Sequence, residues 1–369
     1  MRRSAALAAL FLLAPAAPRA VPLAAPYRAL PPGSLIVAYA TSCNATELHR
    51  EVAAGVNVLV WFSIALQSVD GQPTITGGPD KACVLDVKHR LDAAGYTDVA
   101  HLISVGGWDA PHPNYTVADG GEWWNVFSEW NGASPLYDGI DWDLEGNDNP
   151  DSPYNEFAIE TLFVMREMSA SAKRAGAAVS LVPPQSYLDT TESGFDRSLR
   201  HAYADWQPNF HYRGRNAYAA LLAWDSFLYD FVDVQLYESW SRAGQAVEQG
   251  ADPAAYLAQW VSQVTEGWLV DFASDESVGL ANATLVRVPA SKLVVGFSFG
   301  SKPPNAGKSC LFEAADVQRA FDLLGSAKPR GLAFWNTHLD YHGACDGNDG
   351  INKHCDFATG FNDVLKVRP

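Results

Sequence analysis

The segment 137–146, YDGIDWDLEG, places carboxylates two residues apart at Asp141, Asp143 and Glu145, with Ile, Trp and Leu at the alternate positions. Because side chains alternate across a β-strand, the three acids share one face of a strand and the apolar residues share the other. Carboxylates confined on one face cannot all ionise cheaply, so at least one proton is shared or retained near neutral pH. A carboxylic acid that keeps its proton can donate it to a leaving-group oxygen, which is general acid catalysis.

Glu145 is the predicted proton donor because it is the outermost of the three acids. Asp138 has the opposite parity in the strand, which favours a structural role for it. We find no second carboxylate that is clearly placed opposite Glu145 as a nucleophile. This absence is unusual for a glycosidase, because most use two carboxylates that flank the scissile bond.

Two metal-binding interpretations of the same segment fit less well. An EF-hand loop counted from Asp141 would have its glycine at Gly146, but Ser152 stands where the loop needs glutamate. An Asp-x-Asp site of a nucleotide-sugar transferase could use Asp141 and Asp143, but nothing else in the sequence would hold a nucleotide diphosphate. We therefore expect no metal and no cofactor.

Eight short apolar runs, rich in Val, Ile, Phe and Tyr, alternate with helical stretches along the chain. Near-continuous apolar runs are typical of strands covered on both faces, as in a parallel sheet. Eight alternating units predict the α/β class and a single-domain (β/α)8 TIM barrel, rather than an open doubly wound sheet. The runs span residues 33–40, 55–66, 99–107, 136–146, 177–185, 230–238, 291–300 and 329–338.

Helix signals lie between these runs. Ser152–Pro153 predicts the start of one helix and Gly176 its end, and Asp252–Pro253 predicts the start of another. A third helix is predicted over 313–324, closed by Gly325. The active sites of such barrels lie at the C-terminal ends of the strands. The inward-pointing acids of 137–146 therefore lead up to the barrel mouth, with the last of them nearest to it.

The composition and the N-terminus predict a secreted protein. A hydrophobic content of 48% permits a substantial core, and the net charge of −16 disfavours nucleic acid or anionic membranes as partners. In residues 1–25, Arg2 and Arg3 precede an apolar run and small residues, which indicates a secretory signal peptide and short leader. The alternative, a first core helix, is disfavoured by Pro15, Pro18, Pro22 and Pro26, which would break it. We find no other segment long enough to span a bilayer.

The cysteines and sequons agree with secretion. Cys345 and Cys355 are ten residues apart in a polar, Gly-rich segment that suits a disulfide, and Cys43 with Cys83 is a second possible pair. Cys310 is then left over. Metal binding by these cysteines is the weaker alternative, because no Cys-x-x-Cys pair or histidine cluster accompanies them. Acceptor sequons for N-glycosylation begin at Asn44, Asn114 and Asn282.

The acidic segment resembles a known family. Residues 138–145, DGIDWDLE, match the DGxDxDxE signature of glycoside hydrolase family 18, the chitinases. SVGGW at 104–108 resembles the SxGG motif of the family, and VPPQ at 182–185 and VQLYE at 234–238 resemble strands of the plant-type (class III) single-domain chitinases. FWN at 334–336 is similar to the last barrel strand. The resemblance covers essentially the whole mature chain and implies that 30–369 form a catalytic barrel.

The resemblance implies a role for each matched residue. Glu145 would be the general acid, and the acetamido carbonyl oxygen of the substrate would be the nucleophile, with retained configuration. Asp143 would orient and stabilise the acetamide, Asp141 would share a proton with Asp143, and Tyr237 would hydrogen-bond the acetamide. The implied substrate-binding residues are Trp335, which would stack under the sugar, with Tyr39, Phe62, Gln235 and Gln185.

Three features depart from the family pattern or are particular to this chain. Glu238 follows Tyr237, where the family usually has Asp or Asn. The aromatic segment 186–230 is long, and either walls the groove or makes a helical excursion on the rim. Between residues 300 and 331 there is room for about one helix, so the extra α+β insertion domain before the last strand is expected to be missing. An open groove favours internal cleavage of a polymer.

The sequence thus predicts a secreted, extracellular, monomeric endo-chitinase that binds chitin or N-acetylglucosamine oligosaccharides. One alternative is an endo-β-N-acetylglucosaminidase that acts on N-glycans, because the catalytic signature does not separate the two. Another alternative is a non-catalytic chitin-binding lectin on the same fold. Such proteins typically lose the acid or its partners, whereas Asp141, Asp143, Glu145 and Tyr237 are all present here.

Overall fold

The computed structural model describes residues 27–146, 149, 151–199, 215–237, 241–298, 312–342 and 356–369. The predicted leader and the proposed Cys345–Cys355 pair lie outside the described residues, as do Cys310 and Glu238. No helix within the described ranges is long and apolar enough to cross a membrane.

Eight parallel strands of the described chain close into a barrel. Around the barrel the order is β1, β11, β10, β7, β6, β5, β4 and β2, and β2 pairs with β1 to complete the circle. Each strand lies within one of the eight predicted runs or extends it by a few residues, so the predicted (β/α)8 barrel is confirmed. The barrel strands are β1 (Leu35–Ala40), β2 (Val58–Val69), β4 (Ala100–Gly107), β5 (Gly139–Leu144), β6 (Ala178–Leu181), β7 (Phe231–Gln235), β10 (Leu293–Ser298) and β11 (Gly331–Trp335).

The two faces of these strands build two cores. Side chains on the inner face fill the barrel with small and branched residues, among them Val37, Val60, Leu102 and Val294, all fully buried. Side chains on the outer face pack under the helices, and Trp142 of β5 is one of them. This two-sided burial explains why the strands appear in the sequence as continuous apolar runs.

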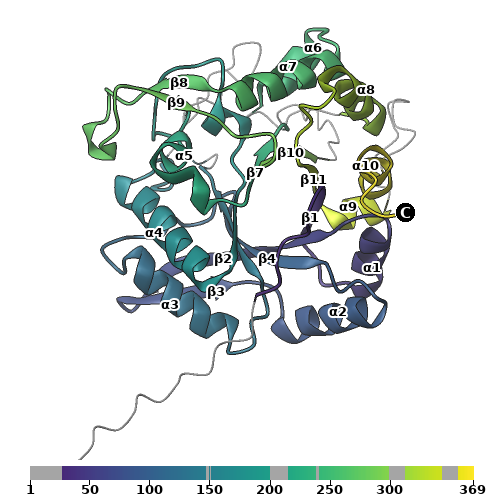
Figure 1. Ribbon diagram of the computed structural model, residues 1–369. Helices are drawn as coiled ribbons and strands as arrows, with labels where there is room; N and C mark the ends of the chain where they lie inside the picture. The colour runs from purple at the N-terminus through teal and green to yellow at the C-terminus, as the bar shows by residue number, and fades with distance from the viewer. Residues whose placement is uncertain are drawn as a thin grey trace, which may run out of the picture.

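Helices surround the strands on all sides (Figure 1). Local sequence fixes several of their ends: the Asp252 side chain caps α7, Glu313 forms a capping box with Asp316 at α8, and Gly176 ends α4 in the left-handed conformation. The described helices are α1 (Ala45–Ala53), α2 (Lys81–Ala93), α3 (Gly120–Asn131), α4 (Ile159–Ala175), α5 (Ala219–Asp225), α6 (Arg242–Glu248), α7 (Pro253–Glu266), α8 (Ala314–Leu324), α9 (Thr337–His342) and α10 (Phe357–Leu365).

The predicted helix start at Ser152–Pro153 is wrong. Helix α4 begins at Ile159, and the residues before it run beside a later segment of the chain. The backbone N–H of Phe157 donates to the Arg197 carbonyl at 2.9 Å, and the Leu199 N–H donates to the Asn155 carbonyl at 2.9 Å. Residues 151–155 form turns, and the two bonds tie residues 155–157 to 197–199, so the helix begins only after them.

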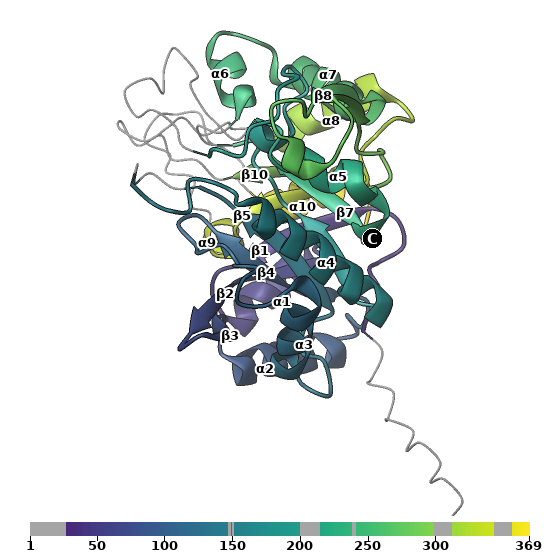
Figure 2. The ribbon, with the colours of Figure 1, turned by 90° about the vertical axis from the view of Figure 1, so that its left-hand side faces the viewer.

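Two antiparallel pieces extend the barrel and were not predicted. β3 (Gln72–Gly77) folds back on the second half of β2, and the pair projects beyond the barrel in Figure 2. β8 (Trp268–Asp271) and β9 (Ala283–Val286) form a separate two-stranded sheet between α7 and β10. Between β10 and β11 the described residues hold α8 and no further strand, in agreement with the expected lack of an insertion domain.

The segment 186–230 contains short helical turns in its described part. After β6 the chain forms η1 (Gln185–Leu188), and before β7 it forms α5 and η3 (Ser226–Leu228). Residues 200–214 lie outside the description, and with them three of the aromatic side chains that suggested a groove wall. Within the described part, Trp224 donates from its ring nitrogen to the Val278 carbonyl at 2.8 Å, which ties α5 to the segment between β8 and β9.

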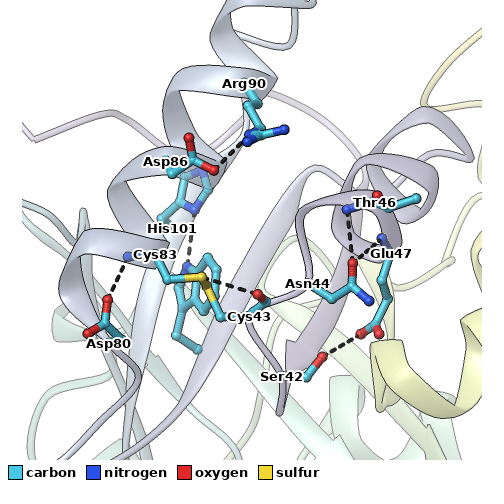
Figure 3. Close-up of a disulfide and its surroundings, with 11 residues drawn as sticks. Ser42, Cys43, Asn44, Thr46, Glu47, Asp80, Cys83, Asp86, Arg90 and His101 are labelled. Atoms are coloured by element: carbon cyan, nitrogen blue, oxygen red, sulfur yellow. Dashed lines mark hydrogen bonds and ion pairs between the residues drawn. A yellow bond between two sulfur atoms is a disulfide. The ribbon is translucent and has the colours of Figure 1, made fainter.

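Cys43 and Cys83 form a disulfide, which confirms the second of the predicted pairs. It joins the segment after β1 to the first turn of α2 (Figure 3). Each half lies next to a helix cap: Asn44 accepts from the Thr46 and Glu47 N–H groups, and Asp80 accepts from the Cys83 N–H.

The disulfide closes a loop of 40 residues. Constraining the unfolded chain over a loop of this length stabilises the fold by about 4 kcal/mol in the chain-entropy model. We expect the double variant Cys43→Ala/Cys83→Ala to lose roughly that amount of unfolding free energy in denaturant titrations. Equal unfolding free energies for the variant and the parent protein would show that the disulfide adds nothing to stability.

Candidate active site

The three alternating acids lie at the C-terminal end of β5, as predicted from their parity. Asp141 and Asp143 point into the barrel, and Glu145 follows the last strand residue at the mouth. All three are buried, and their exposure rises from 0% at Asp141 through 5% at Asp143 to 8% at Glu145. Glu145 is therefore the acid that a molecule entering the mouth would meet first.

One amide group holds the two outer acids together. Gln235 Nε2, from the end of β7, lies 3.1 Å from Asp143 Oδ1 and 3.0 Å from Glu145 Oε1. The same nitrogen donates to the Val182 carbonyl at 2.7 Å, which fixes the amide against β6. Gln235 was predicted as a substrate-binding residue, and its contacts in the structure position the acids.

The innermost acid belongs to a second group of contacts. Asp141 accepts a hydrogen bond from the Ser180 hydroxyl on β6. Its Oδ2 lies 3.4 Å from the Tyr39 hydroxyl, which in turn lies 3.1 Å from Oδ2 of Asp233 on β7. Asp233 was not predicted, although its spacing from Gln235 gives the same alternation that identified the acids of β5.

Burial dominates the ionisation of these groups. It raises the pKa of Asp141 to about 7, although hydrogen bonds from Ser180 and Tyr39 oppose the shift. Burial and the neighbouring charge of Glu145 raise the pKa of Asp143 well above its usual range. Burial also raises the pKa of Glu145, while hydrogen bonds with Asp143 and Gln235 lower it. Within the described chain no Lys, Arg or His side chain forms an ion pair with any of these acids.

An aromatic cluster lies on the other side of the barrel mouth. Trp335 ends β11, and its ring meets Phe62 edge-on at 4.7 Å between ring centroids and lies tilted against Tyr39 at 5.8 Å. Trp335 and Phe62 remain partly exposed, whereas Tyr39 is buried. The structure therefore brings together three of the five predicted substrate-binding residues.

Gly106 and Gly107 allow the strands to approach closely at this end. Both have positive φ, and a side chain on Gly106 would lie 2.5 Å from the Asp143 carbonyl oxygen. A side chain on Gly107 would lie 2.3 Å from the ring of Phe62. These two glycines therefore serve the close packing of the strands.

Side chains from three loop segments hold the backbone around Glu145. The Tyr218 hydroxyl accepts from the Leu144 N–H at 2.9 Å and lies 3.0 Å from its carbonyl oxygen. The Tyr187 hydroxyl accepts from the N–H of residue 146 at 3.1 Å, and His112 Nε2 lies 2.8 Å from the Glu145 carbonyl oxygen. Sequence reasoning missed all three, because each acts on the backbone from a loop or turn that carries no periodic pattern.

The remaining predicted residues lie nearby. Tyr237 follows β7 and is 8% exposed. Gln185 is 2% exposed, and its amide is used within the protein: Nε2 donates to the Tyr256 hydroxyl at 2.9 Å, and Oε1 accepts from the Ser241 hydroxyl at 2.8 Å. A substrate contact by Gln185 stays a prediction.

Asp138 lies at the opposite end of β5 from Glu145. One of its oxygens accepts from the Arg28 N–H at 3.0 Å and the other from the His101 N–H at 2.8 Å. Lys88 Nζ lies 3.9 Å from the second oxygen. These contacts join the first described residues and β4 to β5, so the predicted structural role of Asp138 is confirmed.

The chemistry available to this arrangement follows from its geometry. Glu145 can carry a proton at the mouth, because its environment favours the neutral form. Asp143 and Asp141 lie behind it on the same strand, rather than across the mouth from it. A flat aromatic face at Trp335 could support a ring-shaped ligand opposite the acids. The site is thus suited to protonating a leaving group on a bound ring.

Comparison with known proteins supports the fold alone. No protein-family model matches the chain, and no curated protein sequence matches it. Among solved structures, the catalytic domain of a hyperthermophilic chitinase from Pyrococcus furiosus superposes with a TM-score of 0.55 at 13% identity, covering 92% of this chain and 98% of that one.

Two further solved structures are similar. A GH18 chitinase from Pseudoalteromonas aurantia gives a TM-score of 0.51 at 12% identity and covers 91% of this chain and 100% of its own. A Group IV chitinase from Ostrinia furnacalis, solved in complex with allosamidin, gives 0.50 at 13% identity and covers 90% of this chain and 99% of its own. The chain therefore shares the overall architecture of these proteins.

Proposed function

We propose that this chain is a secreted glycoside hydrolase of family 18, an endo-acting chitinase that cleaves β-1,4-linked N-acetylglucosamine polymers. One observation carries the proposal. Asp141, Asp143 and Glu145 follow one another along β5 to the barrel mouth, and the Gln235 amide contacts both outer acids. The DGxDxDxE signature and the shared architecture of the solved chitinases support it. The Cys43–Cys83 disulfide is consistent with an oxidising, extracellular compartment.

In the first step, Glu145 gives its proton to the glycosidic oxygen as the bond from this oxygen to the anomeric carbon breaks. The carbonyl oxygen of the acetamido group of the same sugar attacks the anomeric carbon from the opposite face and forms a cyclic oxazolinium ion. Asp143 accepts the acetamide N–H and stabilises the positive charge that develops. Asp141 and Asp143 share one proton, because two neighbouring buried carboxylates repel each other when both are ionised.

In the second step, water attacks the anomeric carbon and opens the oxazolinium ring, and the Glu145 carboxylate accepts the proton of this water. The sugar leaves with retained configuration. Two carboxylates that flanked the bond would need to lie on opposite sides of it, but Asp143 and Glu145 come from one strand and contact one amide. This geometry favours the acetamido group as the nucleophile.

Digestion of N-acetylglucosamine hexamer tests the function. Cleavage mainly to dimers and trimers, followed by mass spectrometry, would support an endo-chitinase. Intact hexamer with cleavage of the chitobiose core of N-glycans would instead support an endo-β-N-acetylglucosaminidase. Tight hexamer binding without turnover, in protein shown to be folded, would support the non-catalytic lectin.

Replacement of Gln235 by methionine tests how the acids are positioned. The Gln235 hydrogen bond lowers the pKa of Glu145, so its loss raises that pKa further. Glu145 works in its protonated form, and the alkaline limb of kcat is therefore expected to move to higher pH. The value of kcat at the optimum should fall about tenfold, since the lost bonds involve charged groups.

Gln185→Met is the matched control, because the Gln185 amide contacts Tyr256 and Ser241 rather than the acids. The alkaline limb should not move in this variant. If it moved equally in both variants, the shift would reflect general loosening of the barrel mouth rather than the contact between Gln235 and Glu145.

A further inference from the structure

The further inference concerns Asp233, the fourth buried acid of the barrel interior. Its side chain is 1% exposed and carries one oxygen, Oδ1, that has no hydrogen-bond partner. A side chain on Gly296 of β10 would lie 2.8 Å from this oxygen, so the strand approaches closely there and offers only a CH₂ group. Both oxygens of an ionised carboxylate carry charge and need hydrogen-bond donors, which a CH₂ group does not supply. The contact therefore disfavours the ionised form of Asp233.

The other oxygen, Oδ2, lies 3.1 Å from the Tyr39 hydroxyl, and this hydroxyl lies 3.4 Å from Asp141 Oδ2. A hydroxyl has one hydrogen, so it can donate to only one of the two acids. The other acid must carry a proton to complete the contact. Asp141 already accepts from Ser180 at its second oxygen, whereas Asp233 has no such donor.

We propose that Asp233 is a positioning residue that keeps its proton on Oδ2, donates it to the Tyr39 oxygen, and thereby directs the Tyr39 hydrogen to Asp141. The unpartnered Oδ1 is then the carbonyl oxygen of a neutral acid, which tolerates the CH₂ surface of Gly296. Asp141 receives two donors and becomes the favoured site of the negative charge. The negative charge of this group of acids thus lies on Asp141, which is next to Asp143.

The charged and ionisable groups around Asp233 are consistent with this assignment. Tyr39 on β1 and Asp141 on β5 face Asp233. Asp143 lies two residues after Asp141 on β5, toward the barrel mouth. The neighbouring inner positions of β6, β10 and β11 are occupied by Ser, Val, Gly and Ala, without an ionisable group. Burial and the charge of Asp141 raise the pKa of Asp233 well above its usual range.

Two substitutions of Asp233 test whether the residue acts as a hydrogen-bond donor to Tyr39 or through a negative charge. Asp233→Asn keeps a carbonyl oxygen toward Gly296 and an N–H donor toward Tyr39, and it carries no charge. Asp233→Val has a similar shape but no donor. We expect Asp233→Asn to retain kcat on N-acetylglucosamine hexamer within about threefold, and Asp233→Val to lose about tenfold, at the upper end for a hydrogen bond between neutral groups.

The pH profile adds a readout that a purely structural role would not move. A hydrogen bond to the charged form lowers a pKa, so loss of the Tyr39 donor raises the pKa of Asp141. The acid limb of kcat should therefore move to higher pH in Tyr39→Phe. It should move by a smaller amount in Asp233→Val, which keeps the Tyr39 hydrogen but loses the donor that directs it to Asp141, and stay in place in Asp233→Asn. Because both changes break one chain of contacts, the double variant Asp233→Val/Tyr39→Phe should shift no further than Tyr39→Phe alone.

The kinetic readout rests on the proposed function, whereas a titration does not. In protein labelled with ¹³C at the aspartate carboxyl carbon, one resonance that disappears in Asp233→Asn should keep the chemical shift of a protonated acid at neutral pH. An ionised shift for that resonance, or equal kinetic losses in the Asn and Val variants, would overturn the proposal. A parent protein that fails to cleave hexamer would refute the chitinase function and leave the titration as the test of Asp233.

Discussion

Replacement of Glu145 by glutamine is expected to lower kcat on N-acetylglucosamine hexamer by about 10³-fold or more, at the upper end of the contribution of a general acid. Glutamine has nearly the same shape but no acidic proton. The glycosidic oxygen would then have to leave without protonation. Binding of the hexamer, measured by calorimetry on the variant, should stay within a few-fold of the parent value, because the aromatic cluster at Trp335 is untouched.

The environment of Glu145 makes this loss large. The residue is 8% exposed, and burial raises its pKa, which favours the protonated form that the reaction needs. The backbone on both sides is fixed by Tyr218 and Tyr187. The glutamine would therefore keep the same fixed backbone and lack only the acidic proton.

Asp138→Asn is the matched control for damage to the fold. Asp138 stands on the same segment at the other end of β5, and its oxygens accept from the Arg28 and His101 N–H groups. We expect this variant to melt at a lower temperature and to keep the kcat of its folded fraction. A Glu145→Gln variant that cleaved hexamer at the parent rate would exclude Glu145 as the acid.

The barrel and the row of acids could be predicted from sequence because both depend on short-range patterns. Strands covered on both faces appear as continuous apolar runs, and alternation within 137–146 separates inward acids from outward apolar residues. The start of α4 could not be predicted in this way, because Phe157 is held by a hydrogen bond to Arg197, forty residues away in the sequence.

The residues that hold the backbone of the site could not be predicted from the sequence for the same reason. His112, Tyr187 and Tyr218 reach the backbone of residues 144–146 from distant segments, and a tyrosine hydroxyl that accepts a backbone N–H leaves no local pattern. Asp233 is a different case. It alternates with Gln235 along one face of β7, so parity alone would have placed it in the barrel interior.

The second large effect is expected for Asp143→Asn, which should lower kcat by about 10²- to 10³-fold, the usual loss for a preorganised electrostatic partner of a transition state. The asparagine cannot balance the positive charge of the oxazolinium ion. Asp141→Asn should lose less, because Asp141 acts on the acetamide only through Asp143. Steady-state kinetics on hexamer across pH, with both variants shown to be folded by circular dichroism, measures the difference.

Two measurements on the parent protein distinguish the acetamido oxygen from Asp143 as the nucleophile. If the acetamido oxygen attacks, the parent protein should leave a fully deacetylated glucosamine hexamer intact, and no covalent sugar should appear on Asp143. If Asp143 itself attacked, mass spectrometry of the parent protein quenched during turnover would detect a glycosylated peptide containing residue 143. The position of Asp143 behind Glu145, on the same strand and against the same Gln235 amide, favours the first outcome. A carboxylate in that position can support the acetamide, but it does not face the anomeric carbon from the side opposite to the acid.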